Sequence, residues 1–151
     1  MSRACGTCAA CCTAMAVDDL DGATKPAGER CAHVARDPGR PSLPVLGGSC
    51  GTYETRPDGC RAFRCLWLLG NFGGQERPDR AGVVLWTSAE LKPDRVVVAT
   101  EARAGALDEI ANRGRLRDLE RAGYTIQPFR FGVGEPEPVV SLAPLSRPLI
   151  P

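Results

Sequence analysis

Eight cysteines dominate this chain of 151 residues, and all of them lie at or before residue 65. They are Cys5, Cys8, Cys11, Cys12, Cys31, Cys50, Cys60 and Cys65. A disulfide framework is one way to use so many cysteines. The sequence opens without the apolar stretch of a secretory signal, which predicts a cytoplasmic location, where structural disulfides are rare. Metal ligation is therefore the hypothesis that best explains four cysteines within eight residues.

The cysteine spacing indicates which metals the thiolates would hold. Cys5, Cys8 and Cys11 are spaced C-x2-C-x2-C, and Cys12 follows directly. A C-x2-C pair places two thiolates on one turn, where both can bind one tetrahedral ion. Soft sulfur donors select zinc, copper(I) or iron–sulfur clusters over magnesium and calcium. We expect zinc or an iron–sulfur cluster, and the spacing does not choose between them.

Cys11 and Cys12 are adjacent, and neighbouring residues of an extended chain point their side chains to opposite sides. Binding of one ion by the thiolates of both Cys11 and Cys12 would require an unusual turn of the backbone. Four thiolates per ion is the simplest division of eight. We therefore expect two neighbouring metal positions, with Cys11 and Cys12 on different ions or different irons of a cluster. Cys5 and Cys8 would share one position, and the later four cysteines would close both.

Three further side chains are candidates because they lie near the cysteines in the sequence. His33, the only histidine, follows Cys31 by two residues. It can ligate a metal, act as the base for a cysteine, or be an ordinary polar side chain. Arg56 and Arg61 can support the site by donating hydrogen bonds to thiolate sulfur, or they can lie on a solvated surface.

Composition limits the other classes of function. Nineteen Lys and Arg against eighteen Asp and Glu give a net charge of +1, which argues against a nucleic-acid partner held by bulk charge. The longest run without a formal charge, residues 4–17, is too short to span a bilayer, so no membrane partner is expected. A metal ion or cluster is the partner that the sequence indicates. The protein partner and any catalysed reaction stay open.

The predicted fold is a small, loop-rich α+β domain covering residues 1–151. The chain divides at 70–82, a stretch rich in residues that break regular structure. Residues 1–70 form a cysteine-rich half that metal would hold together, and residues 82–131 form an α+β half with a small sheet and short helices. A proline-rich tail follows at 132–151. We treat the halves as one domain because neither has much core by itself.

Local patterns predict the main elements. Residues 82–87, 95–100 and 124–131 read as strands, the last weakened by Pro128. Residues 60–69 are predicted to form a short helix that ends at Gly70. The dipole of this helix would favour a thiolate at Cys60, its first residue. Residues 105–122 read as helical, but Leu107 and Ile110 fall on a different face from Leu116 and Leu119. A break at Gly114 would resolve that conflict.

The most specific stretch of the sequence is C-x2-Y-x2-R-P-x2-C-R-x-F-x-C at residues 50–65, because several positions besides the cysteines must agree. Together with CGTCAACC at 5–12 and CAH at 31–33, it resembles the YkgJ-type cysteine-cluster family, described as a zinc- or iron-chelating domain. The resemblance covers residues 5–68 and implies that all eight cysteines are metal ligands, with no settled reaction. Some larger proteins with a similar cluster are flagellin lysine methyltransferases, but this sequence has no evident nucleotide-binding glycine motif.

The sequence therefore predicts a metal-binding protein that holds zinc or an iron–sulfur cluster in a structural or storage-like role. One alternative is an iron–sulfur protein that carries out electron transfer, redox chemistry or catalysis. The other is a zinc-stabilised module that contacts a protein or a nucleic acid. A visible absorption spectrum separates an iron–sulfur cluster from zinc.

Overall fold

The computed structural model describes residues 3–35, 46–87 and 95–131, so the predicted tail at 132–151 lies outside the described residues. The strands are β1 (Val17–Leu20), β2 (Ala23–Lys25), β3 (Val34–Ala35), β4 (Ser49–Cys50), β5 (Val83–Trp86), β6 (Val96–Glu101) and β7 (Thr125–Phe129). The helices are α1 (Ala10–Ala14), α2 (Asp58–Ala62), α3 (Pro78–Ala81) and α4 (Ile110–Arg121), with short 3-10 helices η1 (Tyr53–Thr55), η2 (Gly74–Glu76) and η3 (Ala106–Asp108). These short elements confirm the predicted small, loop-rich α+β fold.

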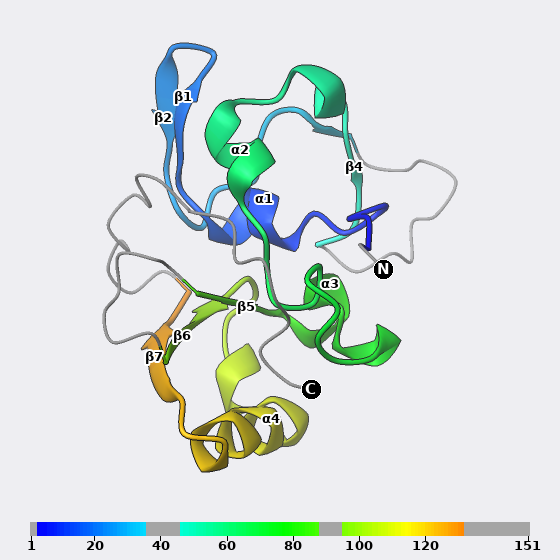
Figure 1. Ribbon diagram of the computed structural model, residues 1–151. Helices are drawn as coiled ribbons and strands as arrows, with labels where there is room; N and C mark the ends of the chain where they lie inside the picture. Colours follow the sequence, from blue (N-terminus) through cyan, green and yellow to red (C-terminus); the bar gives the residue numbers. More distant parts are fainter. Residues whose placement is uncertain (1–2, 36–45, 88–94, 132–151) are drawn as a thin grey trace.

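The strands form three small sheets. β1 pairs with β2 and β3 pairs with β4, both antiparallel. The third sheet has the order β5-β6-β7, with β5 antiparallel and β7 parallel to β6. A parallel pair needs a crossover, which α4 supplies between β6 and β7. In Figure 1 the two-stranded sheets, α1 and α2 lie on one side of the three-stranded sheet, and α4 lies on the other.

The three-stranded sheet is covered on both faces. One face packs on α1, and this α1 cluster consists of Ala10, Ala14, Met15, Leu46, Val84, Trp86, Val98 and Ala102. The other face packs on α4, in a cluster of Leu66, Val83, Leu85, Val97, Ala99, Ala106, Leu107 and Leu119. Because successive strand residues point to opposite faces, a strand buried on both faces reads as a continuous apolar run, as in VVLW of β5. The α1 cluster thus joins the cysteine-rich half to the sheet.

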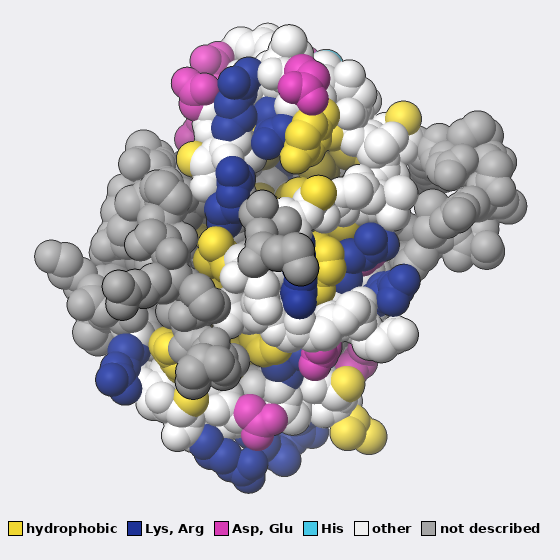
Figure 2. Space-filling model, turned by 45° about the vertical axis from the view of Figure 1, so that its right-hand side comes forward, with side chains coloured by type: hydrophobic (Ala, Val, Ile, Leu, Met, Phe, Trp, Pro, Cys, Tyr) yellow, Lys and Arg dark blue, Asp and Glu magenta, His cyan; other side chains and the backbone are white. Residues whose placement is uncertain are grey.

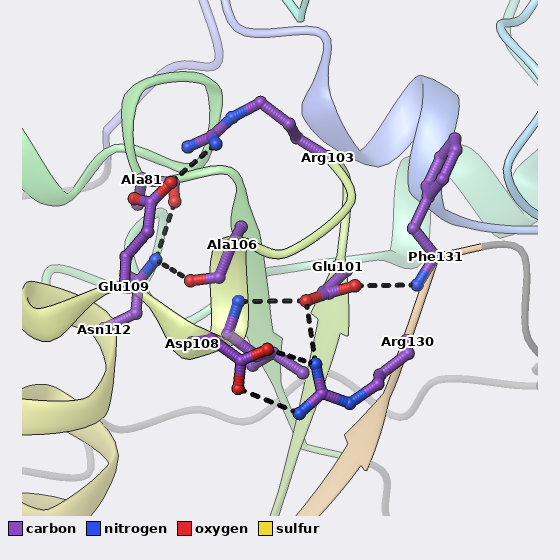
Figure 3. Close-up of polar contacts among 10 residues, drawn as sticks. Ala81, Glu101, Arg103, Ala106, Asp108, Glu109, Asn112, Arg130 and Phe131 are labelled. Atoms are coloured by element: carbon purple, nitrogen blue, oxygen red, sulfur yellow. Dashed lines mark hydrogen bonds and ion pairs between the residues drawn. The ribbon is translucent and has the colours of Figure 1, made fainter.

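A buried carboxylate ties the end of β6 to the segments beside it (Figure 3). Glu101 accepts hydrogen bonds from the backbone N–H groups of Leu107 at 3.0 Å and Phe131 at 2.9 Å. The Arg130 guanidinium donates two further bonds to the Asp108 carboxylate, at 2.7 and 3.0 Å. These contacts hold η3 and the end of β7 against β6.

The three predicted strands are confirmed as β5, β6 and β7, with boundaries shifted by one or two residues. Pro128 lies within β7 and pairs with Ala99 of β6. Its missing N–H is tolerated because β7 is the edge strand of its sheet.

The predicted helix at 60–69 is wrong in its extent. α2 ends at Ala62, and Phe63 is already extended, with φ −63° and ψ 129°. The Phe63 ring packs edge-on against Trp86, with ring centroids 6.0 Å apart. The N–H of Leu66 donates to the Leu85 carbonyl at 2.7 Å. Residues 63–66 therefore run along β5, and these contacts outweigh the local helical pattern.

The predicted break at Gly114 is also wrong, because α4 continues through it. The helical stretch breaks at Glu109, which is extended with φ −64° and ψ 139°. Leu107 belongs to η3 and is buried, whereas Ile110 is 90% exposed. The two side chains never share a helical face, which removes the conflict that suggested a break at Gly114.

Candidate functional site

The first four cysteines lie on a turn and on α1. The Cys8 N–H donates to the Cys5 carbonyl at 2.9 Å, and Gly6 between them has φ +55°, which glycine adopts without strain. Cys11 and Cys12 lie within α1, so the expectation of an extended backbone there is wrong. Adjacent helical side chains diverge by roughly 100° rather than pointing to opposite sides. The side chains of Cys11 and Cys12 are hydrogen-bonded to each other.

Backbone hydrogen bonds bring two later cysteines to α1. The Cys31 N–H donates to the Cys12 carbonyl at 2.9 Å. The Cys31 carbonyl in turn accepts from the N–H of Val34 at 3.1 Å, and Val34 lies opposite Cys50 in the β3–β4 pair. The Cys50 sulfur also contacts the Thr52 hydroxyl, at 3.6 Å.

Cys60 lies in α2, and the turn before it is fixed by Arg61. The Arg61 guanidinium donates to the carbonyls of Glu54 at 2.7 Å and Arg56 at 2.9 Å. Burial raises the pKa of the Cys60 thiol, and the charges of Cys12, Cys31 and Cys50 raise it further. Burial therefore outweighs the helix-terminal effect that the sequence led us to expect at Cys60.

Three cysteines, Cys8, Cys11 and Cys65, pack against the α1 cluster. Burial raises the pKa of the Cys8 thiol to about 12 and also raises the pKa of Cys65. Backbone N–H groups donate to two of these sulfurs and oppose that shift. The donors are Ala10 and Asp79 for Cys8, and Leu68 and Trp67 for Cys65. The Cys8 and Cys65 sulfurs are buried, yet each has backbone N–H donors that would stabilise a negative charge.

Electrostatic interactions link all eight cysteines, which we call the thiol cluster. Cys60 interacts with Cys12, Cys31 and Cys50. Cys11 interacts with Cys12, Cys5 and Cys8. Cys65 interacts with Cys5, and Cys8 interacts with Cys65. Interactions of this kind weaken with distance, so the fold has gathered cysteines that are far apart in the sequence.

The neighbouring cysteines Cys11 and Cys12 differ in the direction in which their pKa values are shifted. The hydrogen bond from Cys11 lowers the pKa of Cys12 to about 7, against the opposing effect of burial, and the charges of Lys25 and Arg30 lower it further. The same hydrogen bond, together with burial, raises the pKa of Cys11 well above its ordinary value. Cys12 therefore loses its proton more readily than Cys11.

Lys25 is a member of the site that sequence reasoning missed. It is 7% exposed, and its ammonium group donates to the carbonyls of Pro26 at 2.8 Å and Glu29 at 2.6 Å. Burial lowers its pKa, while the charges of Cys31 and Cys12 raise it. No local pattern marks this residue, because it reaches the site only when the β1–β2 hairpin pairs it with Val17, just after α1.

Arginines supply further positive charge around the thiols. Arg56 and Arg64 both act on Cys5, and Arg56 also acts on Cys60. The Arg56 guanidinium lies over the Tyr53 ring, 3.7 Å from its centroid. Figure 2 shows Lys and Arg side chains beside side chains of the hydrophobic class, which includes Cys, in the upper part of the molecule.

His33, the candidate ligand or base, is paired with a carboxylate. Its Nε2 lies 2.5 Å from Oδ2 of Asp21, on the β1–β2 turn. The His33 carbonyl accepts the N–H of Gly51 at 2.8 Å, beside Cys50. The structure thus gives His33 a role in holding the β1–β2 turn near β4.

All eight cysteines are free thiols. Across 3–35, 46–87 and 95–131, no group of three or more His, Cys, Asp or Glu side chains stands in positions that could hold a metal ion. The same part of the chain contains no helix with the length and apolar character needed to cross a membrane. Comparisons with family models, with curated proteins and with solved structures found no match.

Proposed function

We propose that the chain binds a transition metal through its eight cysteine thiolates, as zinc or as an iron–sulfur cluster, in a structural or storage-like role. The observation that carries this proposal is the buried ammonium of Lys25, which lies near enough to Cys12 and Cys31 for their charges to act on it. The carbonyls of Pro26 and Glu29 replace part of the hydration of this ammonium, but a buried charge is still costly without negative charge nearby. Beside metal-bound thiolates, which carry excess negative charge, the same ammonium would be stabilising.

The buried thiols would have to give up their protons to a bound cation. With a pKa of about 12, Cys8 holds its proton at neutral pH. A coordinated metal ion deprotonates a thiol outright, so binding would release protons and leave thiolate sulfur. The backbone N–H donors at Cys8 and Cys65 would then stabilise that charge.

Ligation would require the sulfurs to move, since the described side chains do not stand as a ready ligand set. A cysteine side chain has one rotatable bond to its sulfur, with three staggered positions. Turning about that bond moves the sulfur without moving the backbone hydrogen bonds that hold Cys8, Cys12 and Cys31. The soft, anionic donor set suits zinc and iron–sulfur clusters.

The resemblance of residues 5–68 to the YkgJ-type cysteine-cluster family supports the same ligands. A cytoplasmic location is part of this proposal, because thiols stay reduced and available as ligands there.

A second candidate function is iron–sulfur redox chemistry or electron transfer. The observation that favours it is the set of backbone N–H groups donating to Cys8 and Cys65 sulfur. Hydrogen bonds to cluster-ligating sulfur and burial from solvent are two of the means by which proteins set a cluster's reduction potential.

The test is elemental analysis and visible spectroscopy of the full chain purified without oxygen. We expect zinc or iron in a constant ratio to protein, lost when Cys60 and Cys65 are both replaced by serine. Visible absorption that bleaches on reduction would select the redox function, and a colourless zinc protein would select the structural or storage role. A chain that contains no metal and takes up neither zinc nor iron after reduction would overturn the proposal.

A further inference from the structure

We propose that Cys12 and Cys31 form a redox-modification site, at which a peroxide converts the two thiols into one reversible disulfide. The reaction needs two reduced thiols and no metal, so it goes beyond the proposed function and does not depend on it. Both residues are free thiols and partly exposed, which leaves them open to a small oxidant. Disulfides that form in a reducing compartment are usually transient and serve catalysis or redox sensing.

The backbone holds the two residues at a separation that a disulfide can span. The Cys31 N–H donates to the Cys12 carbonyl at 2.9 Å. Bond lengths and angles across one such hydrogen bond set the two Cα atoms about 5–6 Å apart. Disulfides occur at Cα separations of roughly 4.4–6.8 Å. The bond can therefore form with little movement of the backbone.

Lys25 brings positive charge to both thiols. Its ammonium is held by the carbonyls of Pro26 at 2.8 Å and Glu29 at 2.6 Å, on the segment that leads to Cys31. The charges that act on it most strongly are those of Cys31 and Cys12. A neighbouring lysine is typical of reactive cysteines, because it favours the nucleophilic thiolate.

Cys11, the neighbour of Cys12 in the sequence, is not a suitable disulfide partner. Both residues lie in α1, where the Cα atoms of adjacent residues are about 3.8 Å apart. This separation is below the range in which disulfides occur, so a bond between Cys11 and Cys12 would require α1 to be distorted.

Cys5 and Cys8 are the competing pair, because a backbone hydrogen bond of 2.9 Å joins them as well. Their surroundings are less favourable. Cys8 packs against the apolar α1 cluster, and the negative charge of Asp79 acts on it and disfavours its thiolate. We therefore expect Cys12 and Cys31 to be oxidised first.

The chemistry takes place in two steps with hydrogen peroxide as the oxidant. One thiolate of the pair attacks a peroxide oxygen, the O–O bond breaks, and the departing hydroxide takes up a proton to become water. The sulfenic acid formed is then attacked by the second thiolate. The S–S bond forms, the S–O bond breaks, and the oxygen leaves as a second water. The two thiols lose two electrons and two protons, and a thiol reductant reverses the change.

The disulfide would also control metal binding, a consequence that rests on the proposed function. Cys12 and Cys31 are two of the eight proposed ligands, and the thiolate is the form of cysteine that binds metal. Oxidation would therefore weaken the hold of the chain on its metal, and reduction would restore it.

The test is a peptide map of the full chain purified without oxygen and treated with an equimolar amount of hydrogen peroxide. Free thiols are alkylated, and the chain is digested with trypsin in the absence of reductant. Cleavage after Arg30 separates Cys31 from the first four cysteines, since trypsin does not cut between Lys25 and Pro26. We expect peptide 4–30 joined to peptide 31–36, and the two should separate on reduction.

Two variants at adjacent positions assign the bond within peptide 4–30. The joined peptides should persist in Cys11→Ser and disappear in Cys12→Ser. Loss of the joined peptides in Cys11→Ser but not in Cys12→Ser would overturn the proposal. The wild-type map decides the matter even if a variant fails to fold. Alkylated Cys31, a bond from Cys31 to a cysteine after it, or a disulfide confined to peptide 4–30 would each overturn the proposal. Elemental analysis of the same sample decides the proposed function separately.

Discussion

The backbone N–H of Cys31 donates to the carbonyl of Cys12 at 2.9 Å. The last carbonyls of a helix have no partner within it, and this bond satisfies one at the end of α1. The same bond brings the backbone of Cys31 beside that of Cys12. A helix-terminal hydrogen bond therefore contributes to the candidate site, and the short elements around it bury little apolar surface of their own.

Metal removal should loosen the cysteine-rich half more than the sheet. We expect a chelator to speed backbone hydrogen exchange in residues 5–35 and 46–65, because the short elements there depend on the bound metal. Residues 83–87 and 96–129 should keep their protection, since both faces of their sheet are packed. Hydrogen exchange read by mass spectrometry checks this gradient. Equal change in both halves, or none in either, would contradict the role given to the metal.

The sequence predicted those features that rest on local patterns. β-branched runs marked β5 and β6, and cysteine spacing marked the candidate ligands. Features that depend on distant contacts were missed. Lys25 reaches the thiols because a hairpin returns it to α1, and the helix predicted at 60–69 is cut short because Leu66 bonds to Leu85.

The positions of the later cysteines have the same origin. Adjacency of Cys11 and Cys12 predicted that they would serve different ions, which stays a prediction, and it could not say where the later cysteines lie. The β3–β4 pairing brings in Cys50, and Cys65 packs against the α1 cluster. Neither contact has a local signature in the sequence.

Leu66→Ala should strongly destabilise the fold. Leu66 is 1% exposed in the α4-side core, so truncation leaves a cavity beside β5. We expect a loss of about 2–5 kcal/mol in the free energy of unfolding, measured by urea denaturation of the metal-loaded chain. Ile110→Ala is the control, because Ile110 is 90% exposed and its truncation should change stability by less than about 0.5 kcal/mol. Similar losses in the two variants would show that residue 66 is not in the core.

The ion pair between Arg130 and Asp108 should be visible as a depressed carboxyl pKa. The hydrogen bonds from Arg130 lower the pKa of Asp108 below its ordinary value of 3.8. A lowered pKa in the folded state stabilises the fold above the unfolded value, and that stabilisation is lost as pH falls through the folded value. Because Asp108 is exposed to solvent, we expect the stability effect to be small. NMR titration should show its pKa rising in Arg130→Gln and unchanged in Arg121→Gln, whose arginine pairs with Asp118. An unaltered Asp108 titration in Arg130→Gln would exclude the pair in solution.

Lys25→Met should affect the metal-bound and metal-free chains in opposite directions. Removing the buried ammonium relieves the metal-free chain of an expensive charge, so its unfolding free energy should stay constant or rise. The metal-bound chain loses a cation that faces Cys12 and Cys31, so zinc affinity should fall by about tenfold or more. Competition with a chromophoric chelator measures the affinity, and urea denaturation of the metal-free chain measures the stability. Arg117→Met removes an exposed cation on α4 and should leave both quantities unchanged. Zinc affinity that is the same in Lys25→Met as in the wild-type chain would mean that Lys25 is buried for a reason other than the charge of bound thiolates.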